Sequence, residues 1–159
     1  MASGESNVQR PWFEAYPPPK TSKPKTVTKE ELRHWFLAGQ KPGKDFILVD
    51  VRRDDHEGGT IRGAINLPAQ SVYASIPTLY ALFEAAGVKK TIWTCTTSRK
   101  RGNLVAGWFA DFINEKGDSD MQSYALFEGV LGWATAGEEF TDLMEEYDEH
   151  VWQRDHSSH

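Results

Sequence analysis

The segment that decides the fold reads Phe46-Ile47-Leu48-Val49-Asp50-Val51. It is a nearly continuous run of apolar, β-forming residues, as expected of a strand that is covered on both of its faces. Strands of this kind occur in parallel sheets, where helices connect one strand to the next. The segment therefore predicts a central sheet, mainly parallel, with helices on both faces.

Helical signals flank this strand. The sequence Thr28-Lys29-Glu30-Glu31 fits a capping box, because the hydroxyl and the carboxylate can each satisfy a free amide of the first turn. Apolar residues at helical spacing extend the pattern to other segments. Helices are expected from about Lys29 to Leu37, from a cap at Ser75 with Pro77 in the first turn to Gly87, from 104 to 113, and from Glu138 to Glu149.

Further short strands are predicted at Ile65-Asn66-Leu67, at Thr91-Ile92-Trp93-Thr94 and over 121–126. Strands that alternate with helices define an α/β fold of three layers. Five of the eight prolines fall within residues 1–26, which show no periodicity. The predicted organisation is an extended Pro-rich arm over 1–26, a single domain over 27–150 and a frayed tail over 151–159.

Composition restricts the function. The chain has 159 residues, enough for one domain, and a net charge of −5, which argues against a nucleic-acid partner. The longest aliphatic run is far too short to span a membrane, and no signal segment is visible, so no membrane partner is expected. Cys95 is the only cysteine, which excludes internal disulfides and a zinc site with two thiolates. A reducing, cytoplasmic location fits best, and the mass of 18.0 kDa permits passive entry to the nucleus.

The central motif is Thr94-Cys95-Thr96-Thr97-Ser98-Arg99-Lys100-Arg101-Gly102. It places a thiol at the end of a buried strand and an arginine at the start of the next helix. A short loop of this kind can point successive amide N–H groups inward and so surround a tetrahedral anion. No acidic residue occurs between 85 and 110, whereas five basic residues do. The motif therefore predicts an oxyanion-binding loop.

The same loop predicts the chemistry of the thiol. Backbone amides, a helix N-terminus and adjacent cations all favour a thiolate, so Cys95 is expected to be a nucleophile and Arg101 a two-point ligand of the oxyanion. The predicted anion-binding residues are Thr96, Thr97, Ser98, Arg99, Lys100 and Arg101. Two alternatives stay open: Cys95 can be an inert core residue, and Arg99 and Lys100 can be solvated rim charges.

Two neighbouring groups receive other roles. Asp54, Asp55, His56 and Glu57 follow the first strand and can reach the rim of the loop, but none is assigned as a proton donor. Asp50 and Arg52 are expected to brace the end of the sheet through hydrogen bonds.

Three segments together resemble the rhodanese-like family: Asp50-Val51-Arg52, the stretch from Glu57 to Pro68, and the stretch from Leu126 to Trp133. The resemblance covers roughly Asp45 to Gly137. The Glu57-Gly58-Gly59 stretch and the Cys-x5-Arg loop are similar to the branch that contains cell-cycle dual-specificity phosphatases and eukaryotic arsenate reductases, with a size like that of small fungal members. The resemblance implies a rhodanese-like three-layer domain.

The length of the loop bears on the reaction. Sulfur-transferring rhodaneses typically carry a loop one residue shorter, so the resemblance implies phosphate- or arsenate-sized substrates here. It implies that Cys95 attacks a phosphomonoester and forms a phosphocysteine intermediate. Two positions depart from the branch: Thr94 stands before the nucleophile where histidine is usual, and Thr60 replaces another histidine. The departure at Thr94 implies reduced activity.

The resulting expectations are ordered. A tyrosine- or dual-specificity-type phosphatase comes first, acting on a phosphorylated protein or a small aryl phosphate. Arsenate reductase comes second and requires an external thiol donor, such as glutathione with a glutaredoxin, because the chain has no second thiol. A thiosulfate sulfurtransferase and a non-catalytic rhodanese-like interaction module follow. No cofactor and no metal is expected.

Overall fold

The structure is a computed structural model and describes residues 10–153. Its main sheet has five strands in the order β1-β6-β5-β2-β4, and every neighbouring pair is parallel. The strands are β1 (Lys25–Val27), β2 (Phe46–Asp50), β4 (Ile65–Asn66), β5 (Lys90–Thr94) and β6 (Gln122–Leu126). The predicted α/β fold with a parallel sheet is confirmed.

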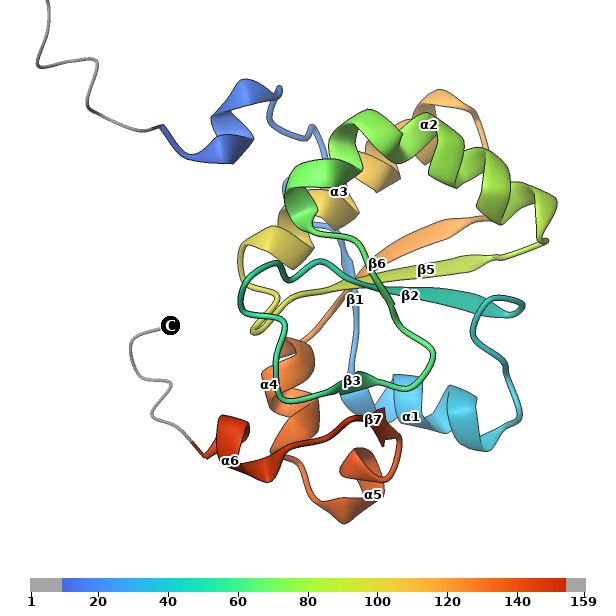
Figure 1. Cartoon of the computed structure of the whole chain (residues 1–159). Helices are drawn as coiled ribbons and strands as arrows, with labels where there is room; N and C mark the ends of the chain where they lie inside the picture. Colours follow the sequence, from blue (N-terminus) through green and yellow to red (C-terminus); the bar gives the residue numbers. More distant parts are fainter. Residues whose placement is uncertain (1–9, 154–159) are drawn as a thin grey trace, which may run out of the picture.

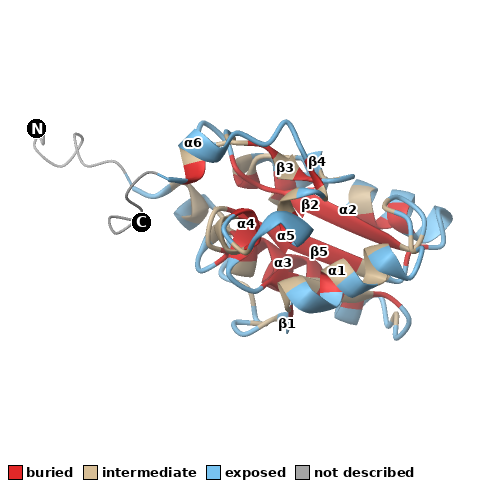
Figure 2. Cartoon of the chain, turned by 90° about the horizontal axis from the view of Figure 1, so that it is seen from below, coloured by how far each residue is buried: buried red, intermediate tan, exposed pale blue. Residues whose placement is uncertain are grey.

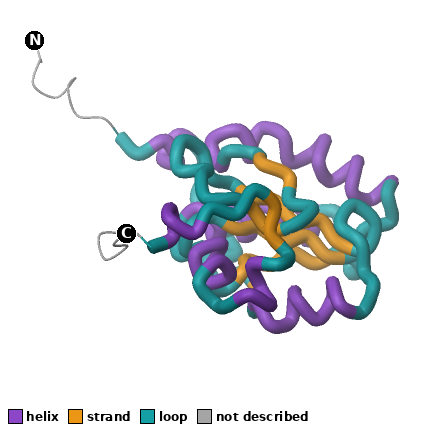
Figure 3. Tube along the Cα trace, turned by 60° about the horizontal axis from the view of Figure 1, so that its bottom comes forward, coloured by secondary structure: helices purple, strands orange, loops and turns teal. Residues whose placement is uncertain are grey.

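Helices cover both faces of this sheet (Figures 1 and 3). On one face lie α2 (Ala69–Ala85) and α3 (Arg101–Glu115). On the other lie α1 (Lys29–Leu37) and α4 (Gly129–Ala134), with α5 (Glu138–Thr141) beyond them. The capping box of α1 is present as expected: the Thr28 hydroxyl accepts from the Glu31 amide, and the Glu31 carboxylate accepts from the Thr28 amide.

The two faces of β2 explain why its sequence is apolar throughout. Ile47 and Val49 belong to the core cluster beneath α2 and α3, whereas Phe46 and Leu48 belong to the cluster beneath α1 and α4. All five residues of β2 are buried, and Figure 2 shows β2 and β5 as buried strands between exposed helical surfaces. Helix packing on both faces therefore removes the usual alternation of polar and apolar residues.

Helix α2 begins earlier than expected. Pro68 is its N-cap and Ala69 its first residue. Ser75 is no cap, since its hydroxyl donates to the Ser71 carbonyl within the helix. The apolar face of the helix continues back to Ala69 and docks on α3, which keeps Pro77 in the interior despite the hydrogen bond that proline costs.

The prediction of one helix over Glu138–Glu149 is wrong. The segment forms α5, then β7 (Met144–Glu145), and then leads into α6 (Glu149–Trp152). β7 pairs antiparallel with β3 (Thr60–Ile61) in a second, two-stranded sheet. Phe140 and Met144 are buried in the core, so a long-range strand pairing replaced the helix that local spacing suggested.

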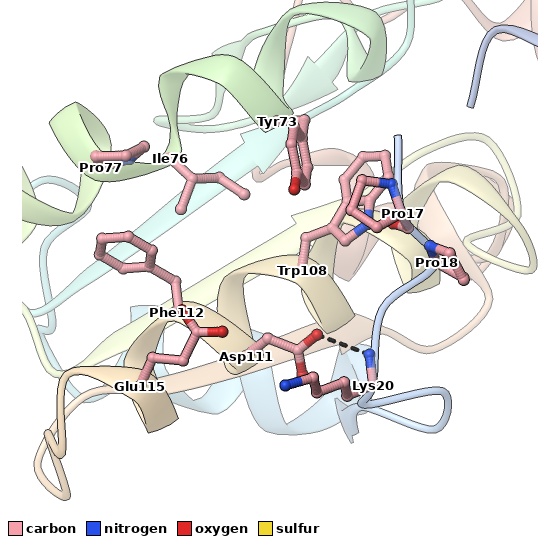
Figure 4. Close-up of a pocket in the computed structure, with 10 residues that line it drawn as sticks. All are labelled: Pro17, Pro18, Lys20, Tyr73, Ile76, Pro77, Trp108, Asp111, Phe112 and Glu115. Atoms are coloured by element: carbon pink, nitrogen blue, oxygen red, sulfur yellow. Dashed lines mark hydrogen bonds between the residues drawn. The ribbon is translucent and has the colours of Figure 1, made fainter. Parts of the chain in front are cut away.

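The predicted arm is extended only in part. A 3-10 helix spans Trp12–Ala15, and the edge strand β1 begins at Lys25, two residues before the predicted start of the domain. Trp108 donates its indole N–H to the Pro17 carbonyl at 2.9 Å. Asp111 accepts from the Lys20 amide at 2.7 Å, as Figure 4 shows. These contacts hold the arm against α3.

A groove of about 310 Å³ lies beside the arm, between α2 and α3 (Figure 4). Its walls are mainly proline and aromatic side chains, and none of its lining residues belongs to the Cys95–Arg101 loop.

Both ends of the chain extend beyond the described residues. Residues 1–9 of the predicted arm and 154–159 of the predicted tail lie outside them. Within the predicted tail, Trp152 is buried against the domain. Among the described residues, none of the helices combines the length and the apolar character needed to cross a membrane.

Candidate active site

The Cys95–Arg101 loop lies at the carboxyl end of the sheet. Cys95 directly follows β5, and Arg101 is the first residue of α3. The neighbouring strand β2 ends at Asp50 in the same register, paired with Thr94, and continues into the loop 51–59. Two loops from adjacent strands therefore meet at this edge, which is where parallel sheets bind ligands.

The Cys95 sulfur faces backbone donors. The Ser98 amide donates to Sγ at 3.1 Å and the Gly102 amide at 3.4 Å. Ser98 adopts a left-handed backbone conformation, with φ of 59°, which turns the chain back over the sulfur. Cys95 is only 3% exposed, and burial alone would fit an inert core cysteine. The two convergent N–H groups distinguish it, because core packing does not require them.

Three hydrogen bonds close a ring around the Cys95 peptide unit. The Cys95 amide donates to Ser98 Oγ at 3.2 Å, and Thr94 Oγ1 donates to the Cys95 carbonyl at 3.1 Å. Thr94 Oγ1 and Ser98 Oγ are 3.2 Å apart. Since the single hydroxyl proton of Thr94 is used on the carbonyl, Ser98 is the donor in that third bond. Thr94 thus helps to hold the loop through Ser98.

Helix α4 supports the loop from the opposite face. The Val130 amide donates to the Cys95 carbonyl at 3.0 Å, and the Leu131 amide to the Thr96 carbonyl at 2.9 Å. A Cβ atom on Gly129 would lie 2.5 Å from the Thr96 carbonyl oxygen, and Gly129 has a φ of +62°. Glycine is therefore required there for both space and conformation.

Arg101 is engaged by a carboxylate from the neighbouring loop. Its two terminal nitrogens donate to the two oxygens of Asp55, at 2.9 and 2.6 Å. Asp55 also accepts from the Thr96 hydroxyl at 2.9 Å. The hydrogen bond from Arg101 holds the pKa of Asp55 well below its usual range, so the carboxylate is ionised. The pKa of Arg101 is raised, first by Asp55 and also by interaction with Cys95.

The other predicted anion ligands differ in whether they face the Cys95 sulfur or the solvent. The Ser98 amide points to the sulfur, whereas the Arg99 amide faces the hydroxyl of its neighbour Thr97 at 3.4 Å. The Arg99 and Lys100 residues are exposed. The Lys100 ammonium lies 4.8 Å from the centre of the Phe13 ring, which ties the loop to the arm. Whether Arg99 and Lys100 bind the anion or are solvated rim charges stays a prediction.

Sequence reasoning left two groups out of the site. The Gly102 amide reaches the sulfur although the predicted loop ends at Arg101, and Asp55 binds Arg101 although the sequence places it only at the rim of the loop. The available signal was the position of Asp55 after β2, whose carboxyl end lies beside that of β5. A one-residue difference in that loop would move the carboxylate away, so position alone could not identify it.

A second ion pair fixes the loop that carries Asp55. Arg52 binds both oxygens of Asp50, and both residues are fully buried. The Arg52 guanidinium also donates to the carbonyls of Glu57 and Gly59, each at 2.9 Å. This network is the brace that the sequence predicted for Asp50 and Arg52, and it clamps the far end of the loop.

The chain is similar to known proteins in sequence and in fold. No family model matches the chain. It is 31% identical over 116 residues to arsenical-resistance protein 2 of Saccharomyces cerevisiae, covering 69% of this chain and 87% of that protein. The structure is similar to that of Ygr203w, a yeast protein tyrosine phosphatase of the rhodanese family, with a TM-score of 0.68 at 21% identity and coverage of 81% and 96%.

The As-Sb reductase from Leishmania major also shares the fold, with a TM-score of 0.65 at 24% identity and coverage of 77% of this chain and 85% of that one. These similarities agree with the parallel sheet and with the Cys-x5-Arg loop at its carboxyl end, since all of them indicate the same family. The chain belongs to the rhodanese-like superfamily, in the branch of cell-cycle dual-specificity phosphatases and eukaryotic arsenate reductases, whose chemistry uses a cysteine.

Proposed function

We propose that the chain is a cysteine-dependent phosphatase that hydrolyses phosphomonoesters of the tyrosine or dual-specificity type. The observation that carries the proposal is the convergence of the Ser98 and Gly102 amides on the Cys95 sulfur, with the Arg101 guanidinium beside the same loop, 3.5 Å from the Thr96 hydroxyl. Donors of this kind stabilise negative charge on the sulfur and on the oxygens of a tetrahedral group. The expected substrate is a phosphorylated protein or a small aryl phosphate.

The reaction has two steps. In the first, the Cys95 thiolate attacks phosphorus, an S–P bond forms, and the P–O bond to the leaving group breaks. The departing oxygen takes a proton from the substrate monoanion, which makes a dedicated protein acid unnecessary. In the second step, water attacks phosphorus, inorganic phosphate leaves, and the sulfur departs as a thiolate. The Ser98 amide, already bonded to Sγ, stabilises that leaving sulfur.

Arsenate reduction is a second candidate, supported by the similarity to arsenical-resistance protein 2. Here Cys95 displaces hydroxide from arsenate and forms an S–As bond. An external thiol then attacks the Cys95 sulfur, and the electron pair of the S–As bond leaves with arsenic as arsenite. A second thiol releases Cys95 from the mixed disulfide. Because the chain has no other cysteine, both thiols come from outside, for example from glutathione with a glutaredoxin.

The remaining proposals concern the cellular location, the partners and the less favoured activities. We place the protein in the cytoplasm, with passive access to the nucleus, and expect neither nucleic acid nor membrane as partner. Sulfur transfer and a purely anion-binding module are the alternatives that the same loop allows. The loop of Cys95 to Arg101 is longer than sulfur transfer needs, which is why hydrolysis ranks above it.

The test compares wild type with Cys95→Ser and Arg101→Ala in three assays: an aryl phosphate, arsenate with glutathione and glutaredoxin, and thiosulfate with cyanide. We expect phosphate release that is lost in both variants. Arsenite release without phosphate release would favour the second candidate. Thiocyanate as the only product would overturn both. If all three assays are silent while phosphate still binds, the protein is an anion-binding module.

A further inference from the structure

One carboxylate holds the donors that a substrate oxyanion would need. Asp55 takes both terminal nitrogens of Arg101 and the hydroxyl of Thr96, with donor–acceptor distances of 2.6 to 2.9 Å. This fork-to-fork pairing is the geometry with which arginine grips phosphate. The carboxylate that pairs with Arg101 is that of Asp55. Its neighbour Asp54 is exposed and makes none of these contacts in the described structure.

We propose that Asp55 is an internal anion that a substrate oxyanion displaces from Arg101, and that it thereby sets which anions the site accepts. The proposal rests on the proposed function only in that the Cys95 loop binds oxyanions. With Asp55 in place, the positive charge of Arg101 is already neutralised. A ligand gains the full attraction of Arg101 only after the Asp55 side chain has moved away.

The displacement requires rotation of a side chain and no opening of a loop. The end of the 51–59 segment is fixed, because the buried Arg52 guanidinium binds the Glu57 and Gly59 carbonyls. Gly59 itself lies against the backbone of the 145–147 segment. The Asp55 side chain, in contrast, is 44% exposed and can turn into solvent. Exposed ion pairs contribute little net stability, so a well-matched ligand can replace this one.

This arrangement selects among anions. A simple carboxylate or another planar anion offers Arg101 nothing that Asp55 does not already supply, and it must be brought from solution at an entropic cost. A tetrahedral oxyanion has further oxygens, so it can bond Arg101 while it also faces the loop whose Ser98 and Gly102 amides surround Cys95. Asp55 therefore excludes carboxylates more strongly than it excludes phosphate or arsenate.

The experiment measures binding of inorganic phosphate by calorimetry to wild type, Asp55→Asn, Asp55→Ala and the control Asp54→Asn. Asp54→Asn removes the same charge from the adjacent position. We expect both Asp55 variants to bind phosphate about two- to fivefold more tightly than wild type, as displacement of a partly exposed ion pair implies. The control should bind like wild type. Acetate should compete with phosphate in Asp55→Ala and should not in wild type.

Three results would overturn the proposal. Equal or weaker phosphate binding by both Asp55 variants would mean that Asp55 holds Arg101 in position instead of competing for it. An equal gain in phosphate affinity in Asp54→Asn would mean that the loss of any negative charge near the loop produces the effect. Absence of phosphate binding in every variant would show that the loop is no oxyanion site. Phosphate binding that follows the expected order, in a protein without turnover, would leave this proposal intact and remove the proposed hydrolysis alone.

Discussion

Two arginine–carboxylate pairs lie at the carboxyl ends of neighbouring strands, and they differ chiefly in burial. Arg52–Asp50 and Arg101–Asp55 each have a shortest N–O distance of 2.6 Å. The side chains of the first pair are 1% and 0% exposed, whereas those of the second are 25% and 44% exposed. The two pairs share their chemistry and have opposite roles, one as a fixed brace and the other as an exchangeable contact.

The difference follows from desolvation. A buried charge that loses its partner has no water to replace it, so neither member of the Arg52–Asp50 pair can leave. Asp55 meets solvent as soon as it turns away from Arg101. Burial, more than residue type, therefore decides which pair supports the fold and which can give way to a ligand.

The largest effect should come from breaking the buried pair. Arg52→Met leaves the buried Asp50 carboxylate without its guanidinium partner, and we expect a loss of about 3–5 kcal/mol in the free energy of unfolding. Urea denaturation measures it. The matched control is Arg62→Met, because Arg62 pairs with Glu145 on the surface with both side chains about half exposed. Similar losses in the two variants would contradict the distinction by burial.

The second prediction concerns Gly129, which packs against the loop that carries Cys95 and Arg101. Gly129→Ala forces a Cβ atom toward the Thr96 and Cys95 carbonyls at a positive φ, and we expect a loss of about 2–4 kcal/mol and weaker phosphate binding. Gly117→Ala is the control, since Gly117 has a φ of +69° and open space around it. If both variants lose the same stability, the close approach to the loop has no cost of its own.

A smaller effect is expected at Thr94. Thr94→Val leaves the buried Ser98 hydroxyl without its acceptor, at a cost of about 1–2 kcal/mol, and loosens the loop around the sulfur. Thr91→Val removes another buried hydroxyl from the same strand, one that donates to Gln122 instead. Thermal unfolding should respond to both substitutions, while phosphate binding should weaken only in Thr94→Val. Equal phosphate affinity in the two variants would remove Thr94 from the support of the loop.

The smallest effect on stability belongs to the exchangeable pair. Asp55→Asn should change the free energy of unfolding by less than about 1 kcal/mol at neutral pH. The pKa of Asp55 is lowered in the folded state, so its contribution is present above the ordinary aspartate pKa of about 4 and is lost as the pH falls below it. Denaturation at several pH values should show the difference from wild type shrinking in acid. A difference that grows in acid would contradict this.

Much of the layout could be read from local sequence. The run Phe46–Val51 required cover on both faces, and the Thr28 capping box fixed the start of α1 within a residue. Cys95 and Arg101 are candidates because a strand, a short loop rich in cations and a helix follow one another without interruption. These features depend on residues close together in the chain, where spacing and propensity act directly.

Other features required distant parts of the chain to meet. Met144 and Glu145 became a strand because β3, more than eighty residues earlier, offered an edge for pairing. Helix α2 kept Pro77 inside because its apolar face docks on α3. In both cases the burial gained by long-range packing exceeded the local preference.

The sequence by itself determined the α/β class, the position of the thiol and the arginine that follows it, because each depends on patterns within a few residues. Only the tertiary structure decided that Asp55 meets Arg101, that Thr94 and Ser98 close a ring around Cys95, and that one ion pair is buried while its counterpart is not. Those facts depend on how the ends of β2 and β5 are brought side by side, and the solvent exposure of a charge exists only once the chain has packed.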